Sequence, residues 1–149
     1  MQKAIGVATK GIERGQTPFG ACIVLRQEVL SVTHNVVWHT TDITAHAEVH
    51  AIRLACQKMG SIDLRGSVIY STCEPCPMCF SACHWANIKK VIFGASIRDA
   101  LQAGFREMTI SNKRMKSLSG TQMQCLGGCL KKENQALFQL WLQRNPKVY

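Results

Sequence analysis

The chain has 149 residues, of which 46% are hydrophobic and 18% are charged. This balance is typical of a globular domain with its own core and excludes a disordered chain. No apolar run approaches the roughly 18 to 20 residues that a membrane span requires. The first fifteen residues lack the features of a secretory signal. We therefore expect one cytoplasmic domain over residues 1–149, with no membrane partner.

The net charge of +9 is unevenly distributed along the chain. Residues 1–86 contain seven Lys and Arg against six Asp and Glu, whereas residues 87–149 contain eleven against three. A basic half favours nucleic acid or another polyanion as partner. It is equally typical of a solvated face that keeps a protein in solution, and composition does not separate these two interpretations.

Hydrophobic periodicity predicts strands that alternate with helices. In chain order we expect a helix over 4–15, a hairpin of strands over 17–26 and 28–37, a helix over 44–60, a strand over 65–72, a helix over 75–86, a strand over 89–96 and a terminal helix over 131–144. Thr44 is predicted to cap its helix, and Pro75 fits a helix start. Residues 111–122 are predicted as loop or surface helix. This order favours an α/β layered fold whose sheet is partly parallel.

Four of the eight cysteines lie in "STCEPCPMCFSAC", residues 71–83. In a reducing compartment such a cluster serves metal binding or catalysis rather than disulfides. Cys76 and Cys79 are three residues apart at a helix start, so that both sulfurs share one face, and the helix dipole there favours thiolates. Cys73 ends a strand, and Cys83 lies about 6 Å further along the helix. We interpret Cys73 and Cys83 as packing residues and Cys76 and Cys79 as metal ligands.

The second helix start, "TAHAEVHAI", offers the nitrogen ligand that two thiolates leave missing. His46 is the predicted ligand, and Glu48 is a predicted acid–base residue that does not bind metal. A rival interpretation pairs His46 with His50, as on metalloprotease helices. Those helices place glutamate directly after the first histidine, where this chain has Ala47. We therefore interpret His50 as a packed or partly exposed helix residue.

The triplet "HAE" at 46–48, followed by "PCPMC" at 75–79, resembles the signature of zinc deaminases. Through these motifs the chain resembles the cytidine deaminase-like superfamily. The resemblance implies a three-layer α/β/α fold with a central mixed sheet of about five strands, and one Zn²⁺ per subunit. Zinc lowers the pKa of a bound water, and the hydroxide attacks a ring carbon while a carboxylate moves the protons. A closed, structural zinc site is the alternative, and it would need Cys73 or Cys83 as a fourth ligand.

Within the superfamily, "CHWA" at 83–86, "QAGFRE" at 102–107 and the terminal Tyr149 are most similar to bacterial guanine deaminases. That likeness implies hydrolysis of guanine to xanthine and ammonia, with Glu48 as the proton shuttle. The substrate-binding residues carried over by position are Phe19, Asn35, Ala47, Trp85, Glu107 and Tyr149. Glu107 would accept hydrogen bonds from guanine N1 and its amino group, while Tyr149 would close over the site. The chain departs from the branch in one respect, because Arg106 precedes Glu107 where two acidic residues are usual.

Other activities fit the same motifs. A tRNA-specific adenosine deaminase would use the basic half to hold its substrate, and a guanosine deaminase would accept the nucleoside. A catalytically inactive zinc scaffold that binds nucleic acid is the non-enzymatic alternative, against which the intact Glu48 argues. The resemblance also implies a homodimer, with the segment of about 125–149 exchanged between subunits. Cys125 and Cys129 are interpreted as turn and packing residues.

Overall fold

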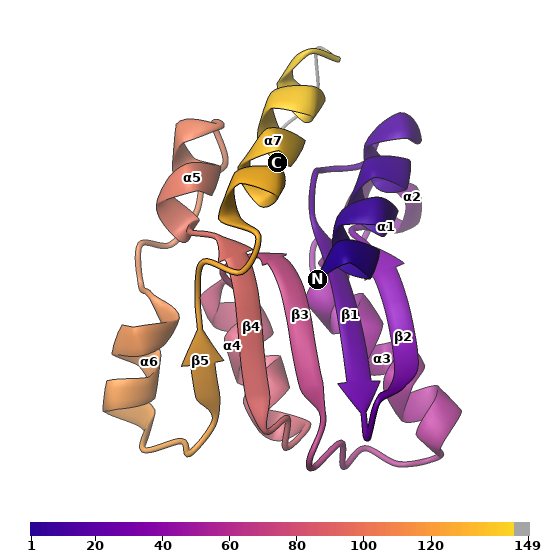
Figure 1. Cartoon of the computed structure of the whole chain (residues 1–149), viewed down its shortest axis with the longest axis vertical. Coiled ribbons are helices and arrows are strands. Elements are labelled where there is room, and N and C mark those ends of the chain that lie inside the picture. Colours follow the sequence, from indigo (N-terminus) through magenta and orange to yellow (C-terminus); the bar gives the residue numbers. More distant parts are fainter. Residues whose placement is uncertain (145–149) are drawn as a thin grey trace.

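The computed structural model describes residues 1–144, and within them five strands form a single mixed sheet in the order β2-β1-β3-β4-β5. The strands are β1 (Gly20–Leu25), β2 (Glu28–His34), β3 (Val68–Cys73), β4 (Lys90–Ala95) and β5 (Gln124–Leu126). β1 pairs antiparallel with both β2 and β3, whereas β3, β4 and β5 run parallel. The predicted mixed sheet of about five strands is confirmed (Figure 1).

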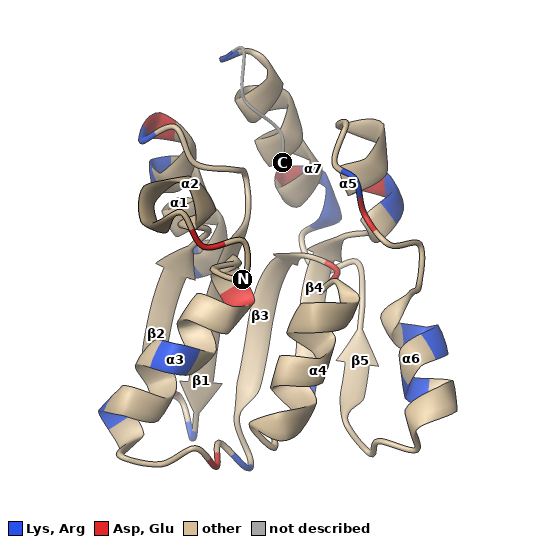
Figure 2. Cartoon of the chain, turned by 180° about the vertical axis from the view of Figure 1, so that it is seen from behind, with Lys and Arg blue, Asp and Glu red and all other residues tan. Residues whose placement is uncertain are grey.

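Helices cover both faces of the sheet. They are α1 (Gln2–Glu13), α2 (Val37–Thr40), α3 (Ala47–Met59), α4 (Pro77–Trp85), α5 (Ile97–Gln102), α6 (Asn112–Ser119) and α7 (Lys131–Leu142). α1 and α7 pack against one another and against one face, and α3 and α4 pack together on the other face (Figures 1 and 2). The arrangement is the three-layer α/β/α fold expected from the resemblance.

Several local predictions are corrected by the structure. Thr44 does not cap α3, because its hydroxyl donates to Asp42 Oδ1 at 2.6 Å and the helix begins at Ala47, after His46. The helix predicted from Pro75 begins at Pro77, with Cys76 as its N-cap. By contrast, the prediction of loop or surface helix over 111–122 agrees with the structure, which contains α6 there, with Ser111 as an N-cap that accepts a hydrogen bond from Arg114 N.

Two apolar cores hold the layers together. One core lies between the sheet and α3 with α4 and is centred on Ile23, Ile69 and Phe80. The other contains Phe105, Phe138 and Trp141, among other side chains. Because Phe138 and Trp141 are buried against their own chain, α7 is an integral part of this fold. An exchange of residues 125–149 between subunits stays a prediction.

The functional edge of the sheet is the one where β3 and β4 end. Parallel strands present their carboxyl ends at one edge, which is where α/β proteins commonly bind ligands. The first turns of α3 and α4 meet near this edge (Figure 2). No helix within residues 1–144 is both long enough and apolar enough to cross a bilayer.

Candidate active site

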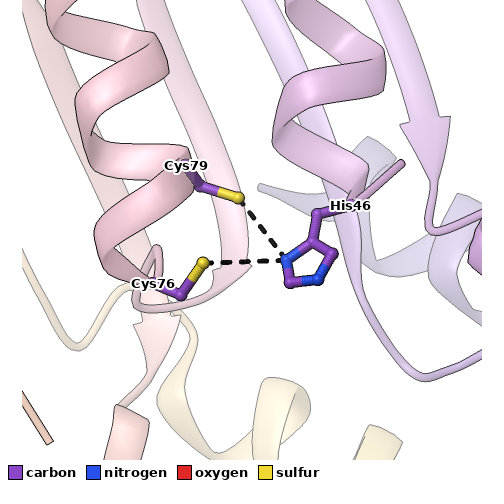
Figure 3. Close-up of side chains that lie close together, drawn as sticks. All are labelled: His46, Cys76 and Cys79. Atoms are coloured by element: carbon purple, nitrogen blue, oxygen red, sulfur yellow. Dashed lines mark hydrogen bonds between the residues drawn. The ribbon is translucent and has the colours of Figure 1, made fainter. Parts of the chain in front are cut away.

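Three predicted metal ligands converge where α3 and α4 begin. His46 is the N-cap of α3, Cys76 is the N-cap of α4, and Cys79 lies in the first turn of α4. His46 Nδ1 lies 3.7 Å from Cys76 Sγ and 3.6 Å from Cys79 Sγ (Figure 3). The three ligand atoms all lie within 4.8 Å of one another. Residues that are some thirty positions apart in the chain therefore form one compact donor set.

The spacing of these atoms fits a tetrahedral zinc ion. Zinc–nitrogen bonds of about 2.0–2.1 Å and zinc–sulfur bonds of about 2.3 Å, at the tetrahedral angle, place nitrogen and sulfur about 3.5–3.6 Å apart. The two nitrogen–sulfur distances lie at or close to that range. The arrangement is therefore better explained as the edges of a coordination tetrahedron than as a set of hydrogen bonds.

Within residues 1–144 the site offers three candidate ligands, one fewer than a tetrahedral zinc ion takes. Cys73, at the end of β3, donates its thiol to Ser96 O at 3.4 Å. Cys83 is fully buried in the core between the sheet and its helices. Neither belongs to the metal-binding group found within residues 1–144, which agrees with their interpretation as packing residues. Three ligands and one open position are typical of catalytic rather than structural zinc.

Without metal, the pKa values of the two cysteines shift in opposite directions. The hydrogen bond from Cys79 lowers the pKa of Cys76 to about 4, with a further contribution from His46. The same bond, together with burial, raises the pKa of Cys79. Burial opposes a charge on His46, but its bond to Cys76 and the nearby carboxylates outweigh burial and raise the pKa of His46. Metal binding must therefore displace protons from these ligands.

Glu48 lies beside the ligands without being one of them. Its side chain is buried on the first turn of α3, where Ser71 Oγ donates to its Oε1 at 2.8 Å. Cys79 Sγ donates to the other oxygen, Oε2, at 3.4 Å. Burial raises the pKa of Glu48, and the negative charge of Cys76 adds to the effect. A carboxyl group whose pKa lies closer to neutrality is suited to take up and return a proton.

The site opens to solvent through a cavity of about 250 Å³. Ile43, Met78 and Met108 contribute its apolar rim, and Arg106 and Glu107 line it beside the metal ligands. A narrower recess continues inward from Glu107 to Phe19 and Glu48. Burial raises the pKa of Glu107 to about 7, with a smaller contribution from the charge of Cys76. One carboxylate thus faces both the entrance and the catalytic recess.

Comparison of the sequence with known protein families agrees with this geometry. A model of the cytidine and deoxycytidylate deaminase zinc-binding region matches residues 1–95. The chain belongs to this deaminase family. The match includes the three metal ligands and Glu48, and it ends before Glu107. The protein is therefore a zinc-dependent aminohydrolase.

Two kinds of deaminase are similar to this one. The chain is 41% identical to guanine deaminase of Bacillus subtilis over 111 residues, which is 74% of this chain and 71% of that protein. It is 40% identical to the tRNA-specific adenosine deaminase of the same organism over 95 residues, 64% of this chain and 59% of that protein. A structure from a study of A-to-I editing by tRNA deaminases superposes with a TM-score of 0.82 at 30% identity, covering 92% of this chain and 96% of that one.

The predicted substrate residues of this deaminase are only partly brought together. Phe19 lines the recess and contacts Phe105 edge to face, with ring centroids 4.8 Å apart. Ala47 is fully buried between His46 and Glu48.

Asn35 is also fully buried, and its Oδ1 accepts a hydrogen bond from Val37 N at 3.0 Å. Its contact with a purine stays a prediction. Tyr149 lies outside the described residues, so that its proposed role over the site also stays a prediction.

Trp85 does not line the cavity of its own chain. It is the last residue of α4 and is 80% exposed. Because α4 begins at the metal site, eight residues of rise separate Pro77 from Trp85, or about 12 Å along the axis. Within its own chain Trp85 therefore lies away from the cavity, and its contact with a base stays a prediction.

Two residues near the chemistry were missed by sequence reasoning. Ser71 donates a hydrogen bond to the carboxylate of Glu48, the predicted acid–base residue, and Glu74 lines the recess. The signal for Ser71 was its position on β3, two residues before Cys73, which places both side chains on one face of the strand. Single hydroxyl side chains on strands are common, so this position alone could not identify Ser71 as a residue of the site.

Proposed function

We propose that the protein hydrolyses guanine to xanthine and ammonia. The observation that carries the proposal is the position of Glu107, which lines both the entrance and the recess that contains Glu48. The similarity to the Bacillus guanine deaminase adds support. The proposed substrate therefore rests on one acceptor group placed next to a general deamination site.

The chemistry of the purine edge explains why this acceptor favours guanine. Guanine presents N–H donors at N1 and at its amino group, whereas adenine presents an unprotonated N1. A carboxylate such as that of Glu107 pairs with two donors but leaves an adenine acceptor facing an acceptor. A buried group left without its partner strongly disfavours the wrong substrate. The Glu107 carboxylate must be ionised for this role. The positive charge of a bound zinc ion would lower its pKa and so favour the ionised form.

The groups of this chain divide the catalytic work. His46, Cys76 and Cys79 would hold zinc, which supplies the activation of the attacking water when it is bound. Glu48 takes the first proton from that water and passes it to a ring nitrogen. It then takes the second proton, from the hydroxyl added to the ring carbon, and passes it to the amine, which leaves as ammonia while the ring carbon becomes a carbonyl. Ser71 anchors Oε1 of Glu48. Because Cys79 as a thiolate has no proton to donate, Oε2 is left available for these transfers.

Deamination of adenosine in tRNA is the second candidate. It is supported by the similarity to tRNA-specific adenosine deaminases and by the basic C-terminal third. Lys113, Arg114 and Lys116 contribute positive charge on α6 (Figure 2). Such charge suits a polyanion, but it does not provide the stacking aromatic side chains that commonly bind single-stranded bases.

Ammonia release from guanine, guanosine and adenosine tests the proposal, together with inosine formation in a tRNA anticodon stem. We expect release from guanine, and none from a Glu48→Gln variant prepared in parallel. Activity on tRNA with none on guanine or guanosine would contradict the assignment. Release from guanosine in preference to guanine would identify the nucleoside as substrate. A zinc-loaded protein inactive on all four would support the non-enzymatic scaffold.

A further inference from the structure

The turn that carries Cys76 is held by residues from a distant part of the chain. This turn, residues 74–76, joins β3 to α4, and Glu74 N donates to Ala95 O at 2.8 Å. Further anchors come from Asn112, the first residue of α6. Neither the metal ligands nor the proposed proton transfers explain why a polar side chain at residue 112 is fully buried here.

Asn112 makes two hydrogen bonds to the turn. Its side-chain Nδ2 donates to Pro75 O at 2.6 Å, and its backbone N donates to Glu74 Oε1 at 2.8 Å. Pro75 O belongs to the peptide unit that also contains the nitrogen of Cys76. A donor fixed on that oxygen therefore sets the plane of the peptide from which the Cys76 side chain departs.

Glu74 links this turn to the loop that contains Glu107. Its Oε1 accepts from Asn112 N at the start of α6, and its Oε2 accepts from Ile97 N at the start of α5, at 3.4 Å. A carboxylate at a helix start satisfies amides that lack partners within the helix. Since Glu107 lies between α5 and α6, one carboxylate fastens both helices that flank its loop.

We propose that Asn112 is a positioning residue for the metal site: its amide fixes the Pro75–Cys76 peptide and so sets the direction of the Cys76 thiolate. Glu74 completes the clamp by holding the start of α6 against the same turn. Partners that orient metal ligands commonly change metal affinity or activity by 10- to 100-fold when they are removed. The inference rests on the zinc site of the family and does not depend on which purine is deaminated.

The test measures metal binding in the folded protein, without a substrate. Asn112→Leu keeps the branched shape of the side chain, with a larger volume, and removes the donor. Asn112→Ser provides a smaller side chain if the first variant does not fold. Zinc transfer to a chromogenic chelator gives the release rate, and the visible spectrum of the Co²⁺-substituted protein reports the geometry of the ligands. We expect release about 10- to 100-fold faster and altered cobalt–thiolate bands.

Ser111→Ala is the matched control. It removes the N-cap bond to Arg114 N, one residue away, and leaves the Pro75 carbonyl untouched. We expect it to lower the melting temperature while the release rate and the cobalt spectrum stay as in the wild type. If the Asn112 variants keep the wild-type rate and spectrum, or if Ser111→Ala changes them equally, Asn112 supports the helix only and the inference is wrong. Because ammonia is not measured, this outcome is independent of the proposed function.

Discussion

Replacing Glu48 by glutamine tests the proton-transfer account with little disturbance of structure. Glutamine has nearly the same shape, and its Oε1 can still accept the bond that Ser71 donates at 2.8 Å. What it lacks is a group that can take up and return a proton. Loss of a general acid–base residue lowers rates by about 10²- to 10⁴-fold, which corresponds to about 2.7 to 5.4 kcal/mol of activation free energy.

The folded state of Glu48→Gln is expected to be at least as stable as that of the wild type, although its catalytic rate falls. Burial raises the pKa of Glu48, so that its ionised form weakens the folded state at neutral pH, and glutamine removes that charge. The Glu48→Gln protein should therefore melt at or above the wild-type temperature. Glu48→Ala should also lose turnover while it keeps zinc and the fold. It leaves the hydroxyl of Ser71, a residue that is 1% exposed, without its partner. An unpaired buried hydroxyl costs about 1–3 kcal/mol, and the vacated volume adds to the loss of stability.

The assay combines turnover, zinc content and melting temperature for the wild type and both variants. We expect zinc content to be equal in all three, because Glu48 does not belong to the metal-binding group. A zinc-loaded Glu48→Gln protein that retains more than a tenth of wild-type kcat/KM would refute the shuttle role. A variant that loses zinc would instead assign Glu48 to the metal shell.

Further predictions follow from the same contacts. Ser71→Ala should lower kcat by roughly tenfold or more with zinc unchanged, as measured by steady-state kinetics; an unchanged kcat would mean that the bond to Glu48 is not needed. Because the pKa of Cys79 is raised without metal, zinc affinity should fall as pH is lowered, and competition with a chelator at several pH values measures this. The pKa of Glu107 is raised from 4.5 to about 7 in the metal-free protein. The stability that its protonated form gives the fold is therefore complete below about pH 4.5 and is lost as pH rises to about 7. Metal-free Glu107→Gln should accordingly become more stable than the wild type across that pH range, as measured by thermal melts. Removal of Tyr149 should lower turnover with the melting temperature nearly unchanged, and equal rates would refute its role over the site.

The metal site could be predicted because its spacing is local. His46 and Glu48 lie two residues apart at one helix start, and Cys76 and Cys79 lie three apart at another, so that short-range geometry fixes each pair. Only the close approach of the two pairs depends on the tertiary structure. Partners chosen by the tertiary structure, such as Ser71, could not be predicted, because the residues that contact them are 23 or more positions away.

Short elements were the least predictable parts of the fold. β5 has three residues and α5 has six, which is too short for a periodic pattern to emerge. α5 is instead fixed by a capping box between Ser96 and Asp99. Trp85 was placed by resemblance without regard to the length of α4, which carries it away from the cavity. The same resemblance predicted Glu107 beside the metal ligands. Its loop is held there by contacts between residues 23 and 38 positions apart in the chain, which no short motif records.

Guanine and the tRNA anticodon stem should be compared as substrates of one zinc-loaded preparation each of the wild type and of Glu107→Gln. We expect the wild type to release ammonia from guanine with a higher kcat/KM than it forms inosine in tRNA. We also expect Glu107→Gln to lose guanine turnover while it keeps its zinc. Inosine formation without ammonia from guanine, or a Glu107→Gln protein as active on guanine as the wild type, would contradict the proposed role of Glu107.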